Sequence, residues 1–139
     1  MMRTPIVRMP LRVRYHECDP QGIVFNANYL AYFDMASFEF FDEIFGSYDY
    51  LLARKVDAVV AEANLRYHAP GHPGDRLVVE VTLDHLGTTS FILGFTVVRG
   101  DQTLTTGTNR YVFVGTETLT KAAPPDDVRE KLAARLPPA

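Results

Sequence analysis

One acidic residue stands where acyl-transfer chemistry is possible. Asp19 lies in the turn Cys18-Asp19-Pro20-Gln21-Gly22, a few residues before a long apolar segment that begins near Tyr29. The first turn of a helix offers backbone N–H groups that have no intrahelical acceptor, together with about half a positive charge. A carboxylate beside such groups suits acyl transfer, in which negative charge develops on a carbonyl oxygen. A plain turn fits the same residues, because Asp-Pro is common turn chemistry, so these features alone leave both interpretations open.

Other reactive side chains have weaker settings. Glu62 occupies the polar face of a strand-like segment. Two interpretations stay open for it: a solvated surface residue, or a residue that subunit association brings near the acyl group of the substrate. His68 and His72 span a Pro-Gly turn with no cysteine or acidic cluster beside them, so no metal site is predicted. The carboxylate of Asp19 next to Cys18 should raise the pKa of the thiol, which favours a packing role for it.

A long helix is needed to position this turn. Neither proline nor glycine occurs between Tyr29 and Phe45, apolar residues recur at spacings of three and four, and Gly46 follows as a stop. So much of the circumference is apolar that we expect other elements to wrap the helix. Before the turn, residues 11–17 alternate polar and apolar side chains, which predicts a strand.

Four more strands are predicted after the helix, at about residues 59–68, 77–84, 91–97 and 103–114. Short links make consecutive strands antiparallel neighbours, so the fold class is α+β. A five-stranded antiparallel sheet could curl around the central helix. Pro124-Pro125 then precede a short charged helix at about 125–136. We expect one domain over 1–139, with its core at about 8–116.

Composition excludes several classes of protein. The chain has 139 residues, 47% of them hydrophobic, and a formal net charge of -3. This balance argues against a nucleic-acid partner, which would favour a basic domain. No apolar run is long enough for a signal peptide or a membrane span. Cys18 is the single cysteine, so a reducing cytoplasm is the expected location.

The segment from Asp19 to Tyr29 resembles the N-terminal motif of hotdog-fold acyl-CoA thioesterases of the 4-hydroxybenzoyl-CoA thioesterase type. Members of that group read Asp-Pro-x-Gly-Ile-Val-Phe-x-x-Asn-Tyr before a long central helix. The resemblance extends over roughly residues 10–115, including the Tyr67-His68-Ala69-Pro70 turn and the Thr89-Ser90-Phe91 strand start. It implies a hotdog fold that hydrolyses an acyl-CoA thioester to free acid and CoA, with no cofactor beyond the CoA of the substrate. The residues that match the motif are Asp19, Pro20, Gly22, Ile23, Val24, Phe25, Asn28 and Tyr29.

The resemblance also implies roles for individual residues. In that family the aspartate matching Asp19 acts as nucleophile or as general base for water, and the backbone N–H at the position of Asn26 polarises the thioester carbonyl. CoA leaves as a thiolate with a pKa near that of cysteine, about 8.5, so no strong general acid is needed. The substrate-binding residues expected along the channel are Gly22, Val24, Phe25, Tyr29, Val60, Glu62, Thr88, Thr89 and Ser90.

Departures from related families narrow this expectation. Asn26 stands where thioesterases of the Tol–Pal cluster type carry histidine, which argues against histidine-assisted catalysis at this position. Val24 stands where Asp-x4-His hydratases carry histidine, so the hydratase branch is disfavoured. Gly87-Thr88-Thr89-Ser90 replaces the basic run that grips CoA phosphates in some relatives. An acyl carrier protein thioesterase and a non-catalytic acyl-binding subunit therefore stay open as alternatives. The other candidates for contact with CoA phosphates are Arg66, Arg76, Arg99 and Arg110.

Self-association is expected as well. One protomer would leave sheet edges and the substrate channel open, which predicts a homodimer, and the resemblance favours a homotetramer built as a dimer of dimers. Sites in this family lie between protomers, so Asp19 of one chain would work with channel residues of the other.

Overall fold

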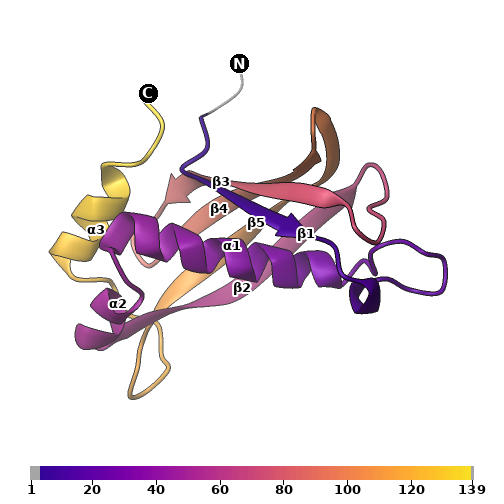
Figure 1. Ribbon diagram of the computed structural model, residues 1–139. Coiled ribbons are helices and arrows are strands. Elements are labelled where there is room, and N and C mark those ends of the chain that lie inside the picture. The colour runs from indigo at the N-terminus through magenta and orange to yellow at the C-terminus, as the bar shows by residue number, and fades with distance from the viewer. Residues whose placement is uncertain (1–3, 139) are drawn as a thin grey trace.

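A computed structural model describes residues 4–138, and in them a five-stranded antiparallel sheet lies against one long helix (Figure 1). The strand order across the sheet is β1-β3-β4-β5-β2, so β1 and β2 form its two edges. This arrangement confirms the α+β class and the central helix expected from the sequence. The strands are β1 (Val7–Arg12), β2 (Val56–Tyr67), β3 (Arg76–Leu86), β4 (Ser90–Arg99) and β5 (Gln102–Gly115).

The long helix α1 (Asn28–Phe45) supplies the aromatic half of the core, and it confirms the helix predicted from Tyr29. The Phe33 ring stacks on Phe95 of β4, with centroids 4.4 Å apart. Gly107 of β5 makes room for this contact, because a Cβ there would lie 2.7 Å from the Phe33 ring. The helix thus packs directly against the backbone of the sheet.

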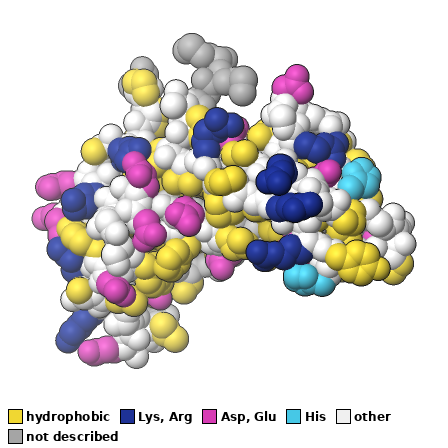
Figure 2. Space-filling model, in the orientation of Figure 1, with side chains coloured by type: hydrophobic (Ala, Val, Ile, Leu, Met, Phe, Trp, Pro, Cys, Tyr) yellow, Lys and Arg dark blue, Asp and Glu magenta, His cyan; other side chains and the backbone are white. Residues whose placement is uncertain are grey.

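The outer side of α1 stays uncovered in the protomer. Leu30, Met35 and Phe38 are 42%, 48% and 53% exposed, and Figure 2 shows apolar side chains among acidic ones on this side. The sheet therefore covers one side of the predicted central helix, and these three side chains on its outer side remain exposed in a single protomer. Its apolar outer side is available for contact with another surface.

Two short helices close the end of the sheet near Phe45. α3 (Asp126–Ala133) confirms the predicted C-terminal helix but ends three residues earlier than residue 136. α2 (Asp49–Ala53) has only five residues and was not predicted. Asp127 of α3 joins them by accepting hydrogen bonds from Tyr50 at 2.6 Å and Arg54 at 2.8 Å. Among the described residues, no helix combines the length and apolar character needed to cross a membrane.

The first strand differs from its prediction. β1 ends at Arg12, and Tyr15–Glu17 form a short 3-10 helix instead of continuing the strand. The alternation over residues 11–17 was misleading, because the Glu17 carboxylate accepts a hydrogen bond from the Arg14 N–H and closes a turn. Pro10 fits within β1 because an edge strand tolerates proline.

The edge strand β2 also departs from the predicted pattern. Val59 and Val60, adjacent residues of a strand, are both partly exposed, at 42% and 48%. A register shift between Val60 and Glu62 leaves Ala61 out of the pairing with β5, and no strand lies on the other side of β2 within the described residues. An apolar strand edge therefore remains open.

Candidate active site

A hollow of about 370 Å³ lies beside the start of α1 and contains Asp19. Two segments far apart in sequence form it: the turn that leads into α1, and the residues that follow β2. Four of the predicted site residues meet here, and they are Asp19, Val24, Asn26 and Tyr29. The remaining lining residues are Gln21, Ile23, Tyr67, His68, Ala69 and Pro70.

The turn around Asp19 is held by its own backbone. The Asp19 carbonyl accepts from the Gly22 N–H at 2.9 Å, and the Asp19 N–H donates to Ile23 at 2.9 Å. Gly22 has a φ of 77°, which only glycine adopts without strain. One carboxylate oxygen of Asp19 accepts from the Gln21 N–H at 2.9 Å, and within residues 4–138 no cationic side chain pairs with it. The carboxylate is therefore positioned by the turn without being neutralised.

The backbone before α1 presents a free donor. The Asn28 N–H donates to the Phe25 carbonyl and the Tyr29 N–H to the Asn26 carbonyl, whereas the Asn26 N–H meets no acceptor among the described residues. The Tyr67 hydroxyl donates to the Asn26 carbonyl at 3.2 Å and so fixes this residue from the opposite side of the hollow. Asn26 thus places one unsatisfied N–H near the carboxylate-bearing turn.

Glu17 connects the turn to the helix without lining the hollow. Its carboxylate accepts from the Tyr32 hydroxyl at 2.9 Å, and its carbonyl accepts from the Asn28 side-chain amide at 2.7 Å. Burial, followed by the hydrogen bond and the charge of Glu17, raises the pKa of Tyr32, so this hydroxyl stays a donor. These contacts give Glu17 a positioning role between the turn and α1.

Tyr29 lines the hollow, and Cys18 directly precedes Asp19 in the turn. Tyr29 is only 3% exposed, and its ring lies 5.8 Å from that of Tyr67. A Cβ on Gly71 would lie 3.1 Å from both the Tyr29 hydroxyl and Val24, so glycine allows this loop to approach closely. Burial raises the pKa of the Cys18 thiol, and the nearby Glu17 and Asp19 carboxylates add to the shift. Cys18 is thus a packing residue with little thiolate character.

Several predicted channel residues lie elsewhere in the protomer. Gly22 shapes the turn, and Phe25 is 46% exposed outside the hollow. Val60 and Glu62 lie on the exposed edge strand, where Glu62 is 3.9 Å from Arg110. Thr88 and Thr89, in the β3–β4 turn, and Ser90, the first residue of β4, lie at the opposite end of α1, where Arg129 of α3 donates a hydrogen bond to the Gly87 carbonyl. In one protomer, the predicted residues from Val60 to Ser90 do not line the hollow that contains Asp19.

Six lining residues were not predicted as site residues, and they are Gln21, Ile23, Tyr67, His68, Ala69 and Pro70. Tyr67 ends β2 and His68 follows it, and only the folded chain brings them to Asp19, 48 and 49 residues earlier in the sequence. His68 bonds Thr106 at 2.9 Å, whereas His72 faces Asp75, so the two histidines act apart. Within residues 4–138, no three His, Cys, Asp or Glu side chains gather as metal ligands would.

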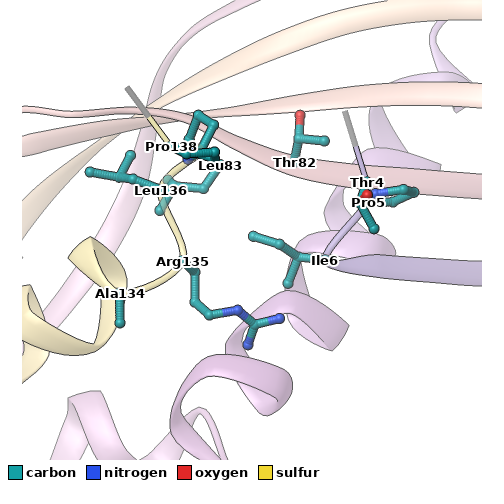
Figure 3. Close-up of a pocket in the computed structure, with 10 residues that line it drawn as sticks. Thr4, Pro5, Ile6, Thr82, Leu83, Ala134, Arg135, Leu136 and Pro138 are labelled. Atoms are coloured by element: carbon teal, nitrogen blue, oxygen red, sulfur yellow. The ribbon is translucent and has the colours of Figure 1, made fainter. Parts of the chain in front are cut away.

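A second hollow, of about 600 Å³, lies at the other end of the molecule between the two termini (Figure 3). Ile6, Leu83 and Leu136 line it, and Arg135 is its one charged lining residue. The Arg135 guanidinium lies 3.5 Å from Glu43. Among the described residues that line this hollow, none carries a carboxylate.

Comparisons with known proteins place the chain among thioesterases. Residues 13–132 match the family model described as the Thioesterase-like superfamily. The acyl-CoA thioester hydrolase YbgC of Escherichia coli is 30% identical over 103 residues, which are 74% of this chain and 77% of that protein. A hypothetical protein from Thermus thermophilus superposes with a TM-score of 0.86 at 26% identity, covering 92% of this chain and 98% of that one. A gentisyl-coenzyme A thioesterase superposes with a TM-score of 0.80 at 25% identity, covering 90% and 98%.

Proposed function

The chain belongs to the Thioesterase-like superfamily, and from that premise we propose that it hydrolyses acyl-CoA thioesters with Asp19 as the catalytic carboxylate. Acyl-CoA thioester hydrolysis itself is supported by the Escherichia coli relative of that name and by the hotdog thioesterases that share the fold. The observation that carries the role of Asp19 is its place in a hollow with an acceptor-free N–H at a helix start. Among residues 4–138, no other acidic side chain lines that hollow.

Two routes through Asp19 are chemically complete. As nucleophile, its carboxylate attacks the thioester carbonyl, the C–S bond breaks, CoA leaves as thiolate, and water hydrolyses the resulting anhydride. As general base, Asp19 takes a proton from water while the water oxygen attacks, and the tetrahedral intermediate then expels the thiolate. Since a thiol of pKa about 8.5 leaves readily, neither route needs a strong acid. The absence of a cationic partner beside Asp19 suits both routes.

The Asn26 N–H is the proposed oxyanion donor. Its lack of an acceptor leaves it available to the carbonyl oxygen of the substrate, where negative charge develops. The hydrogen bond from Tyr67 to the Asn26 carbonyl holds the residue in place before substrate arrives. Such preorganised donors each contribute about 3–4 kcal/mol of transition-state stabilisation. The Asn26 side chain has no part in this bond.

We further propose that the complete site needs a second copy of the chain. The open edge of β2 and the exposed Leu30, Met35 and Phe38 of α1 offer an apolar surface to a partner. A homodimer, alone or within a homotetramer, would let the partner supply the channel residues that lie away from Asp19 in one protomer. The single cysteine suits a reducing compartment, so the cytoplasm is the proposed location.

A panel of thioesters tests this function. Hydrolysis of benzoyl-CoA, phenylacetyl-CoA and straight-chain acyl-CoAs from acetyl to palmitoyl is followed by the release of free thiol. We expect turnover of at least one class, and the preferred chain identifies the acyl group. A protein that is folded and self-associated but hydrolyses no CoA thioester would contradict the proposed function.

A further inference from the structure

Three arginines lie together at the β1 edge of the sheet, shortly before the turn that holds Asp19. Arg12 and Arg76 are direct partners in the β1–β3 pairing, and Arg14 follows two residues after Arg12. Figure 2 shows basic side chains gathered on this part of the face, while acidic ones gather over α1. Like charges placed opposite each other weaken a sheet. Repulsion within the cluster therefore lowers the stability of the fold, although the chain as a whole is acidic.

Nearby carboxylates do not neutralise this cluster. In the described part of the chain none of the three arginines forms a salt bridge, and all three side chains are exposed. Glu17 is engaged by Tyr32 and by the backbone of Arg14. Asp75 is held by Arg99, whose guanidinium is 2.5 Å away. The positive charge of the cluster is thus available to an external anion.

The cluster borders a hollow that also has an aromatic wall. This hollow, of about 630 Å³, is lined by Arg12, Val13, Arg14, Tyr15, Pro73 and Gly74. Tyr15 is 87% exposed, so its aromatic ring faces solvent instead of packing into the core. Arg12 Nε donates to the Gly74 carbonyl at 3.4 Å, which restrains its guanidinium. Guanidinium groups bind phosphates in a bidentate manner, and an exposed ring can stack on a nucleobase.

The cluster is close to the proposed catalytic turn. The Cys18 thiol donates to the Arg14 carbonyl at 3.9 Å, and Asp19 is the next residue. Asp19 is five positions after Arg14, so their Cα atoms lie at most about 18 Å apart even in an extended chain. The loop after β2 borders both hollows, because Pro70 lines the one with Asp19 and Gly74 lines the one with the arginines.

We propose that Arg12, Arg14 and Arg76 bind the nucleotide phosphates of the CoA moiety, with the adenine against Tyr15. The inference rests on the proposed function, since it assigns the other end of the same substrate. The flexible pantetheine arm would run from this arginine cluster to Asp19. An acidic carrier protein would meet the same charges, but the exposed ring in a hollow favours a ligand that has a flat base. The site also replaces the basic run that is absent at Thr88–Ser90.

The test compares two substrates that share an acyl group. The ratio of kcat/KM for an acyl-CoA to that for the same acyl-pantetheine is measured in the wild type and in the Arg12→Gln, Arg14→Gln double variant. Each charge-assisted hydrogen bond to a phosphate is strong, so the ratio should fall about 10- to 100-fold. Lys121→Gln is the control. Lys121 follows β5, is exposed, and forms no salt bridge within the described residues, so the loss of its charge should leave the ratio within about twofold.

Affinity for free CoA, measured by calorimetry, provides a readout independent of hydrolysis. The double variant should bind CoA about 10- to 100-fold more weakly than the wild type. An unchanged ratio together with unchanged CoA affinity would overturn the assignment, as would a loss confined to acyl carrier protein substrates. If the wild type hydrolyses no thioester but binds CoA through these arginines, the proposed function fails while the nucleotide site stands.

Discussion

Replacing Asn26 with proline would remove the proposed oxyanion donor from the backbone. The Asn26 N–H has no acceptor among the described residues, so the folded protein loses no hydrogen bond. Proline is tolerated near a helix start, and the carbonyl that accepts from Tyr67 is kept. The donor is worth about 3–4 kcal/mol in the transition state, and about 1.4 kcal/mol is tenfold in rate. We therefore expect kcat to fall about 10²- to 10³-fold.

Asn26→Ala is the matched control, because it deletes the side chain and keeps the N–H. Its kcat should stay within about threefold of the wild type, since the backbone makes the proposed bond. Thiol release from a saturating acyl-CoA gives kcat for both variants, and thermal unfolding shows whether proline disturbs Phe25, which becomes the restricted residue before proline. A folded Asn26→Pro enzyme as active as Asn26→Ala would refute the role of this N–H.

Three further outcomes follow from the packing and the open surface. Gly107→Ala places a Cβ 2.7 Å from the Phe33 ring and should lower the unfolding free energy by about 1–3 kcal/mol. Gly115→Ala is the control, because its Cβ meets nothing closer than 3.4 Å and should not lower the stability. Equal melting temperatures for the two variants would contradict this prediction. Burial and then Glu17 raise the pKa of Tyr32 above 10.0, so the unfolded chain loses this proton first and stability falls as pH rises past about 10. Denaturant titrations should show a shallower alkaline loss for Tyr32→Phe than for the wild type, and equal slopes would count against this account. Val60→Asp puts a charge on the open β2 edge and should abolish self-association, measured by sedimentation, together with activity, measured by thiol release. A fully active monomer would disprove the two-protomer site.

Local sequence patterns predicted the elements whose side chains bury one clear face. α1 was predicted from Tyr29 to Phe45 because its spacing is helical and glycine follows at residue 46. β3 and β4 were predicted because both alternate regularly in the centre of the sheet. Edge strands pair with a neighbour on one side only, so their side-chain alternation is less regular. The N-terminal alternation therefore missed the turn closed by Glu17, and the alternation in β2 missed the bulge after Val60.

The candidate site was predictable only where it is local. The turn with Asp19, Val24 and Asn26 lies in one short stretch, and the family resemblance singled it out. Tyr67 and His68 reach the same hollow through the return of β2 along the sheet, which no local pattern records. The link from Glu17 to Tyr32 is likewise a tertiary contact across 15 residues. The predicted residues on β2 and near the β3–β4 turn lie away from this hollow in one protomer, and their role rests on the proposed second copy of the chain.

The hydrolysis rate of Asp19→Asn tests the central claim most directly. Asparagine keeps the shape and can still accept from the Gln21 N–H, but it has no carboxylate to attack the thioester or to take a proton from water. Asp101→Asn, in the exposed β4–β5 turn, is the control for the loss of one negative charge. We predict that Asp19→Asn lowers kcat by about 10²- to 10⁴-fold with an unchanged melting temperature, while Asp101→Asn stays near the wild type. A folded Asp19→Asn enzyme with more than about a tenth of wild-type kcat would contradict the account.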